Sequence, residues 1–163
     1  MELIVAVDQS FGISKEGGIP WHSKEDLKHF KSITTTSPDK PNVVVYGRKT
    51  MDTLPKKSLE GRINLVLSRG VTKDTESVKF FKNKQGVLTW LDENRDSYNK
   101  VFIIGGAQIY EMFGEECDKL HMTIIQGLHE CDINLNPQLF KWKLESCTKL
   151  SEQASYLFFT KRA

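Results

Sequence analysis

Residues 101–110 read Val-Phe-Ile-Ile-Gly-Gly-Ala-Gln-Ile-Tyr, and this stretch decides the fold class. Its first four residues are apolar and mostly β-branched, which is typical of a strand covered on both faces. The paired glycines Gly105 and Gly106 permit a tight turn, and residues Ala107 to Phe113 follow with a helical pattern. A strand that turns directly into a helix is the repeating unit of parallel α/β sheets.

The same alternation appears on the N-terminal side of this stretch. Helical patterns lie between several apolar runs, and in the first of them Leu27, Phe30 and Ile33 share one apolar face. Strands that alternate with helices predict a mostly parallel sheet. The expected strands are Leu3 to Val7, Val43 to Tyr46, Ile63 to Leu67, Val78 to Phe81 and Val101 to Ile104; the other expected helices are Lys24 to Ile33, Lys49 to Leu54 and Gln85 to Arg95.

The C-terminal part follows a different pattern. Leu120 to Ile125, Lys141 to Lys149 and Tyr156 to Lys161 read as strands with no helix between them, so we expect antiparallel pairing there. The predicted fold class is therefore α/β, with a mixed, mostly parallel eight-stranded sheet, flanking helices and an antiparallel C-terminal hairpin. No repeat or linker divides the chain, so residues 1–163 are expected to form a single domain.

Composition excludes several classes of function. Hydrophobic residues make up 39% and charged residues 27%, and 23 Lys and Arg nearly balance 21 Asp and Glu, so nucleic acid is not an expected partner. No apolar stretch approaches the ~20 residues that cross a bilayer, so no membrane association is expected. Once the sheet is covered, no unpaired apolar element remains, and a monomer is the expectation.

The three cysteines indicate the compartment. Cys117, Cys131 and Cys147 are odd in number and widely spaced, and the N-terminus lacks a secretion signal, so they read as reduced thiols in the cytoplasm. Two histidines, His121 and His129, lie near the first two cysteines, but the spacings fit no common zinc pattern. We therefore expect no metal.

Three expected strand ends carry groups suited to anions, and ligands of open α/β sheets bind at that edge. They are Tyr46-Gly47-Arg48-Lys49-Thr50, Ser68-Arg69-Gly70 and Gly105-Gly106. Cations that open a helix oppose its dipole unless a phosphate is bound, and arginine offers a planar fork of donors. Solvated cations and plain turns explain each segment taken alone. Together, the three favour a dinucleotide that carries an additional 2′-phosphate.

Asp26 has two explanations. Ser23 followed by Asp26 resembles a capping box at the start of the first helix. Alternatively, a lone acid beside Leu27, Phe30 and the Ile19-Pro20-Trp21 segment can recognise a flat heterocycle with two adjacent N–H donors. Desolvation in such surroundings would raise the pKa of Asp26 and suit it to acid–base work.

The ordered set of motifs resembles the dihydrofolate reductases. It comprises Gly18-Ile19-Pro20-Trp21, Asp26-Leu27, Gly47-Arg48-Lys49-Thr50, residues Gly61 to Arg69, Ile103-Ile104-Gly105-Gly106, Tyr110, Thr123, Asp132 and residues Tyr156 to Phe159. The resemblance implies NADPH-dependent reduction of 7,8-dihydrofolate to 5,6,7,8-tetrahydrofolate. A hydride would be transferred to pterin C6 and a proton to pterin N5. The tetrahydrofolate formed would support one-carbon and thymidylate metabolism. Antifolates would be ligands as well.

The resemblance also implies roles for individual residues at the folate site. Asp26 would hold the pterin ring with support from Thr123, and Trp21 belongs with them as a catalytic residue. Arg62 would pair with the glutamate α-carboxylate of folate, with Lys31 nearby; a solvated arginine at a strand start is the structural alternative. The remaining folate-site residues are apolar and are Ile4, Val5, Ala6, Leu27, Phe30, Leu54, Leu59 and Ile104.

For the cofactor, the resemblance implies a 2′-phosphate clamp of Arg48, Ser68 and Arg69. A pyrophosphate cradle would combine Lys49 and Thr50 with the amides of Gly105 to Gln108, and the Gly105–Gly106 peptide would be cis. The remaining cofactor contacts are Ala6, Ile13, Ser14, Gly18, Gly47, Leu67, Ile104, Gly106, Ala107, Ile109 and Tyr110, with Ala6, Ile13 and Tyr110 near the nicotinamide.

Some positions depart from the family pattern. Tyr46 stands where Met is frequent, Met51 where Trp is frequent, Ser14 where Gly is usual, and Leu135-Asn136 where Phe-Pro is frequent. Because of these departures, the family's local packing, its antifolate sensitivity and the motion of its loop are not carried over to this chain, where the loop runs from Ser10 to His22. Two rival functions share the fold: reduction of a riboflavin precursor, for which Asp26 and Arg62 have no clear partner, and a non-catalytic binding module.

Overall fold

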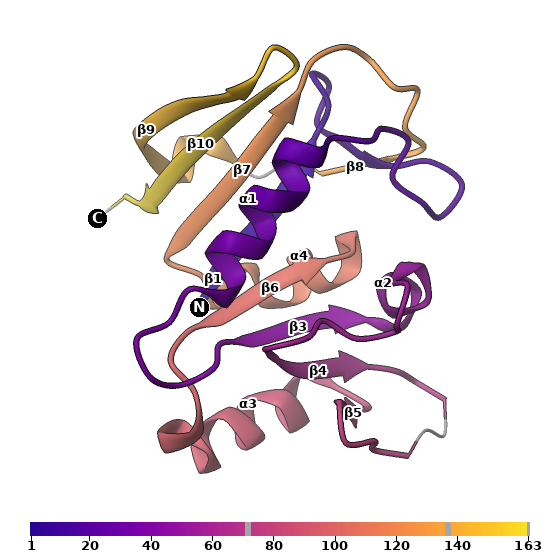
Figure 1. The fold of residues 1–163 in the computed structure, drawn as a ribbon, viewed down its shortest axis with the longest axis vertical. Helices are drawn as coiled ribbons and strands as arrows, with labels where there is room; N and C mark the ends of the chain where they lie inside the picture. Colours follow the sequence, from indigo (N-terminus) through magenta and orange to yellow (C-terminus); the bar gives the residue numbers. More distant parts are fainter. Residues whose placement is uncertain (71–72, 136–137, 163) are drawn as a thin grey trace.

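The computed structural model describes residues 1–70, 73–135 and 138–162, so the Leu135-Asn136 departure lies partly outside the described residues. Within them, eight strands form one sheet in the order β5-β4-β3-β6-β1-β7-β10-β9 (Figure 1). These strands are β1 (Glu2–Val7), β3 (Val43–Gly47), β4 (Ile63–Leu67), β5 (Val78–Phe81), β6 (Val101–Gly105), β7 (Lys119–Ile125), β9 (Trp142–Ser151) and β10 (Ala154–Lys161).

Strand directions confirm the predicted fold class. Every pairing from β5 across to β7 is parallel, whereas β10 pairs antiparallel with both β7 and β9. The C-terminal hairpin therefore adds two strands beside β7. Connections between parallel strands need crossovers, and helices supply most of them, while β9 and β10 need only a short turn.

Helices cover both faces of the sheet. Those in the described residues are α1 (Lys24–Thr35), α2 (Arg48–Thr53), α3 (Lys84–Glu93) and α4 (Ala107–Phe113), with 3₁₀ turns at Arg95–Ser97, Gly114–Glu116 and Leu139–Lys141. Residues of α1 and α2 pack with Ile4, Val44 and Phe102 on one face. Residues of α3 and α4 pack with Val43 and Val45 on the other. We call these the α1 face and the α4 face; in Figure 1, α1 crosses in front of the sheet.

Local signals explain where α1 begins. The hydroxyl of Ser23 accepts a hydrogen bond of 3.1 Å from the backbone N–H of Asp26, which confirms Ser23 as the helix N-cap. The helix continues to Thr35, two residues beyond the predicted end. The prediction for α3 was too long at its C-terminal end, because the helix ends at Glu93 and a 3₁₀ turn begins at Arg95.

A second, two-stranded sheet was not predicted. It pairs β2 (Gly12–Ser14) with β8 (Ile133–Asn134) in antiparallel fashion, with Gly12 opposite Asn134 and Ser14 opposite Ile133. Both strands are too short to show an alternating pattern in the sequence. They can be recognised only from their pairing in the folded chain. This pairing ties the Ser10–His22 loop to the segment that precedes β9.

Candidate active site

Asp26 lies in the first turn of α1 and faces β7. The side chain of Thr123 forms a hydrogen bond with the Asp26 carboxyl. Burial raises the pKa of Asp26, while the Thr123 hydrogen bond and the charge of His29 act in the opposite direction. Tyr110 is close enough for the Asp26 charge to add to the burial that raises the pKa of its phenol. The structure therefore brings Asp26 and Thr123 together, whereas Tyr110 packs on the α4 face and donates its hydroxyl to the carbonyl of Ile4 (2.8 Å).

Most of the predicted apolar folate residues gather on the α1 face. Ile4, Phe30, Leu54, Leu59 and Ile104 belong to one packed cluster, and Ala6 pairs with Thr123 across β1 and β7. Leu27, next to Asp26, leaves 54% of its surface exposed. Val5 differs, because its side chain packs in the cluster of the α4 face. The alternation of a strand thus separates Val5 from Ile4 and Ala6.

Two hydrogen bonds within the protein orient the Arg62 side chain. Its Nη1 donates to the hydroxyl of Thr34 on α1 (2.9 Å) and its Nε donates to the carbonyl of Glu60 (3.0 Å). Burial lowers the pKa of Arg62 without threatening its charge. Lys31 is exposed. The Lys56 hydrogen bond and charge are the main cause of the lowered pKa of Glu60, and the charges of Lys31 and Arg62 add to them. The two predicted tail-binding cations therefore lie near one acidic residue.

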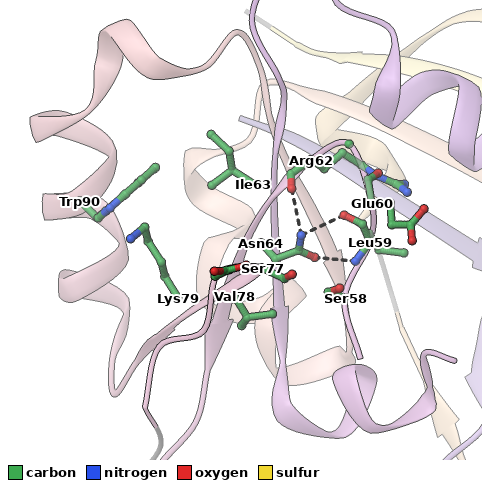
Figure 2. Close-up of a pocket in the computed structure, with 12 residues that line it drawn as sticks. Ser58, Leu59, Glu60, Arg62, Ile63, Asn64, Ser77, Val78, Lys79 and Trp90 are labelled. Atoms are coloured by element: carbon green, nitrogen blue, oxygen red, sulfur yellow. Dashed lines mark hydrogen bonds between the residues drawn. The ribbon is translucent and has the colours of Figure 1, made fainter. Parts of the chain in front are cut away.

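Asn64 fixes the loop that carries Arg62. It is buried, and its amide nitrogen donates to the carbonyls of Leu59 (2.9 Å) and Arg62 (3.0 Å), as Figure 2 shows. Its amide oxygen accepts from the N–H of Leu59 (2.9 Å) and from the hydroxyl of Tyr46 (2.7 Å). Tyr46, a departure from the family pattern, is thus joined to the Arg62 loop.

Beside this loop is an open hollow of about 460 Å³. Figure 2 shows it between Leu59 and Glu60 on one side and Lys79 and Trp90 on the other. Neither Asp26 nor Thr123 lines it. The hollow is therefore separate from the predicted pterin site, although Leu59 and Arg62 belong to both surroundings.

The predicted phosphate-binding residues lie at the ends of β3, β4 and β6. The cis peptide between Gly105 and Gly106 is present, as the resemblance implied. A Cβ on Gly105 (φ +118°) would lie 3.0 Å from the Tyr110 oxygen, and one on Gly47 would lie 3.2 Å from Ile109. The positive φ requires glycine at position 105, whereas a Cβ at position 47 would crowd the side chain of Ile109.

The cationic groups of this edge remain accessible. Gly47 is opposite Leu67 in the β3–β4 register, so the segments that carry Arg48 and Arg69 begin side by side. Arg48 and Arg69 are exposed, and Arg48 has an ion pair of 3.4 Å with Asp52. Ser68 is buried beside them. Two guanidinium groups, a hydroxyl and backbone amides form a donor set that fits a phosphorylated dinucleotide.

The Ser10–His22 loop is tied down at several points. The N–H of Glu16 donates to a carboxylate oxygen of Asp132 (2.9 Å), and Lys15 lies 3.5 Å from Glu130. Trp21 packs edge-on against His129, with ring centroids 5.3 Å apart. Ile13 is buried, and Ser14 and Gly18 lie along the same loop. These contacts hold the predicted catalytic Trp21 near the 127–134 segment.

Asp8 is a structural carboxylate that our sequence reasoning missed. It accepts hydrogen bonds from Ser10, from the N–H of Gly12 (2.8 Å) and from the N–H of His129 (3.0 Å). Burial raises the pKa of Asp8, but these donors outweigh it and bring the pKa to about 2. No motif marks a single Asp after a strand, so only the assembled loops reveal its role.

Three features concern the described residues as a whole: the state of the cysteines, the grouping of possible metal ligands and the length of the helices. All three cysteines are unpaired, and burial raises the pKa of Cys117 to about 12. Among the described residues, no group of three His, Cys, Asp or Glu side chains is arranged to hold a metal ion. No helix in the described ranges is long and apolar enough to cross a membrane.

Comparison with known proteins gives one consistent result. A family described as dihydrofolate reductase matches residues 1–161. The chain is 38% identical to dihydrofolate reductase type 9 of Escherichia coli, over 98% of this chain and 90% of that protein. It is 34% identical to a putative dihydrofolate reductase of Caenorhabditis elegans, over 97% and 89% respectively. It also matches a bifunctional dihydrofolate reductase-thymidylate synthase of Glycine max with 36% identity, and it spans 33% of that longer protein.

The fold and these relatives define an oxidoreductase that works with a nicotinamide cofactor. The chain belongs to the dihydrofolate reductase family, and its reaction is the reduction of dihydrofolate to tetrahydrofolate in folate and one-carbon metabolism. The family match thereby favours folate over the riboflavin precursor and an enzyme over a binding module.

Proposed function

We propose that this chain uses NADPH to reduce 7,8-dihydrofolate at the site around Asp26 on the α1 face, with Asp26 as the residue that holds the pterin ring. One observation carries the proposal: a desolvated Asp26 carboxyl is hydrogen-bonded to Thr123 on a face whose neighbouring cluster is apolar. A carboxylate with two acceptor oxygens matches the adjacent N3 and 2-amino donors of a pterin. Antifolates that present the same pair of donors would bind there as well.

The chain's own groups contribute position and environment. Asp26 fixes and polarises the ring, Thr123 orients the carboxylate, and the apolar residues of α1 and β1 exclude water. The Ser10–His22 loop, with Trp21, covers the site. Solvent water delivers the proton to pterin N5 because Asp26 binds the opposite part of the ring. When bound, NADPH supplies the hydride that reaches pterin C6.

Arg62 and Lys31 are proposed to bind the glutamate tail of the substrate. The guanidinium of Arg62 is already oriented by Thr34 and by the Glu60 carbonyl, so little side-chain freedom is lost when a carboxylate pairs with it. Lys31 adds positive charge from the exposed side of α1. This arrangement favours a substrate with an anionic tail.

For the cofactor, we propose that Arg48, Ser68 and Arg69 bind the 2′-phosphate and so select NADPH over NADH. Lys49, Thr50 and the amides of Gly105 to Gln108 would hold the pyrophosphate. Ile13, Ala6 and Tyr110 would flank the nicotinamide, and Ser14, Gly18 and Leu67 would complete the contacts. The support is the exposed cations at one strand edge and the close packing of Gly47 and Gly105.

Further proposals concern the whole chain. We infer a single domain over residues 1–163, because strands from both ends of the described chain share one sheet. We also propose a monomer that works in the cytoplasm, with no nucleic-acid or membrane partner. Sedimentation of the purified protein would test the monomer directly.

The test of the proposed function is the loss of NADPH absorbance on adding dihydrofolate. We expect the Asp26→Asn variant to lose turnover by about 10²-fold or more, with NADPH affinity unchanged. Glu25→Gln is the matched control, since Glu25 is an exposed acid in the same helical turn. Equal losses of turnover and NADPH binding in Asp26→Asn would contradict the role of Asp26.

A further inference from the structure

A line of polar side chains runs beneath α1, where a helix normally packs on apolar strands. The register places Ile4 beside His121 and Ala6 beside Thr123 across β1 and β7. On the other side of β7, Tyr156 of β10 pairs with Thr123. Because side chains alternate along a strand, residues two apart on each strand share this face. The line therefore continues from Thr123, the partner of Asp26, toward the N-terminal end of β1.

His121 is the centre of this line. Its Nε2 lies 2.8 Å from a carboxylate oxygen of Glu2, and its Nδ1 lies 2.7 Å from the hydroxyl of Tyr156. The rings of His121 and Tyr156 are stacked, with centroids 5.9 Å apart. Burial raises the pKa of Glu2, but the His121 hydrogen bond and the charges of Lys100, His121 and Lys119 outweigh it. Glu2 therefore remains an anion that anchors His121.

His29 connects this line to Asp26. It follows Asp26 by three residues on α1, a spacing that places the two side chains as neighbours on one helix face. Its ring packs against that of Tyr156, with centroids 4.1 Å apart. The Nε2 atom of His29 is buried and has no hydrogen-bond partner among the described residues. Packing against Tyr156, rather than a hydrogen bond at Nε2, holds the ring.

The electrostatic influence between Asp26 and His29 acts in both directions. Burial and the charge of His121 lower the pKa of His29, whereas the charge of Asp26 raises it. In return, the charge of His29 opposes the burial that raises the pKa of Asp26. Tyr156 stays neutral throughout, since burial raises its pKa to about 12. His29 is thus uncharged at neutral pH and gains its charge as the pH falls.

We propose that His29, braced by Tyr156 and by the His121–Glu2 pair, is a positioning residue that keeps the Asp26 carboxylate ionised as the solution becomes acidic. As His29 binds a proton, its charge opposes protonation of Asp26 in the same helical turn. The significance for the reaction rests on the proposed function, in which Asp26 holds the pterin as a carboxylate. The coupling itself belongs to the free enzyme and can be measured there.

The first experiment follows the ¹³C signal of the Asp26 carboxyl against pH, with the signal assigned by its absence from Asp26→Asn. His29→Gln should move the titration of Asp26 to higher pH than in the wild type. Lys28→Gln is the matched control, because Lys28 is an exposed neighbouring cation whose removal leaves His29 in place. An unmoved Asp26 titration in a folded His29→Gln variant would overturn the proposal.

A second measurement does not require His29→Gln to fold. Because coupling between two sites is reciprocal, removing the Asp26 charge must make His29 harder to protonate. The titration of the His29 ring should therefore move to lower pH in Asp26→Asn. If the His29 ring titrates at the same pH in Asp26→Asn and in the wild type, the coupling is overturned.

The two claims remain separable. Loss of turnover in Asp26→Asn with no mutual effect between the two titrations overturns the inference about His29 and leaves the proposed function standing. Mutual shifts with normal turnover in Asp26→Asn support the His29 coupling and overturn the proposed role of Asp26.

Discussion

The two faces of the sheet differ in chemistry although the same strands supply both. The α4 face buries an apolar layer that includes Val7, Val43, Val45, Leu65 and Phe113, each with 0% of its surface exposed. The α1 face buries polar groups among its apolar ones: Glu2, Asn64, His121, Thr123 and the hydroxyl of Tyr46. The comparison indicates that the polar groups around Asp26 belong to the α1 face, whereas the α4 face contributes mainly apolar packing.

The buried polar groups of the α1 face are tolerated because they are paired. Asn64 makes four hydrogen bonds, to Leu59, Arg62 and Tyr46. His121 has a partner at each ring nitrogen. A buried polar group without a partner costs about 1–3 kcal/mol, so the buried polar side chains of the strands depend on their partners. On α1, the buried Nε2 atom of His29 is an exception, because it has no partner among the described residues. The α4 face depends instead on close packing, which is insensitive to pH.

The largest expected effect is on the α4 face. Phe113→Ala should lower the free energy of unfolding by about 3–5 kcal/mol, because it removes a fully buried ring. Turnover per folded molecule should stay near the wild-type value. Urea unfolding and steady-state kinetics on the same sample check both statements, with Phe113→Leu as the milder variant. A specific loss of turnover would break the division of labour between the two faces.

The second prediction concerns Asp8, a buried carboxylate that belongs to neither face. The pKa of Asp8 falls from 3.8 to about 2 on folding, so its ionised form contributes about 2 kcal/mol of stability. A lowered pKa gives stability that is present above the unfolded value and is lost as the pH falls from about 4 toward 2.

Asp8→Asn should therefore be less stable than the wild type at neutral pH and should lose less stability on acidification. Free energies of unfolding measured at neutral pH and at acidic pH give the comparison. Identical acid dependence in the two proteins would show that Asp8 gains nothing from its hydrogen bonds.

The smallest effect comes from a matched pair of hydroxyl deletions, one on each side. Tyr46→Phe removes the bond to Asn64 (2.7 Å), and Tyr98→Phe removes the bond to the carbonyl of Leu91 (2.8 Å). Each should cost about 1 kcal/mol in unfolding free energy. Only Tyr46→Phe should also raise the KM for dihydrofolate, since Asn64 positions the Arg62 loop. A similar KM change in both variants would argue against this link.

Sequence reasoning located the regular elements because their patterns are local. The runs that became β1, β3, β4 and β6 are mostly apolar, and the turn at Gly105-Gly106 leads directly into α4. The N-cap at Ser23 was visible for the same reason. The β2–β8 sheet was not predicted, because its strands are too short to show a pattern and are recognised only by their pairing with each other.

The candidate site was predictable in part. Ordered motifs placed Asp26, Thr123 and Arg62 in one family pattern, and the structure brings Asp26 and Thr123 into contact. Nothing in the sequence marked Asp8 or His29. Each gains its significance from partners far along the chain, His129 for Asp8 and Tyr156 for His29.

By itself, the sequence determined the element order, the mostly parallel sheet and the family, because periodicity, glycine positions and motif order are properties of the linear chain. Only the tertiary structure decided which side chains share a face. It separated Val5 from Ile4, paired Tyr46 with Asn64 and placed His29 between Asp26 and Tyr156. Burial and charge act through space, and the distances that set them arise only when remote strands come together.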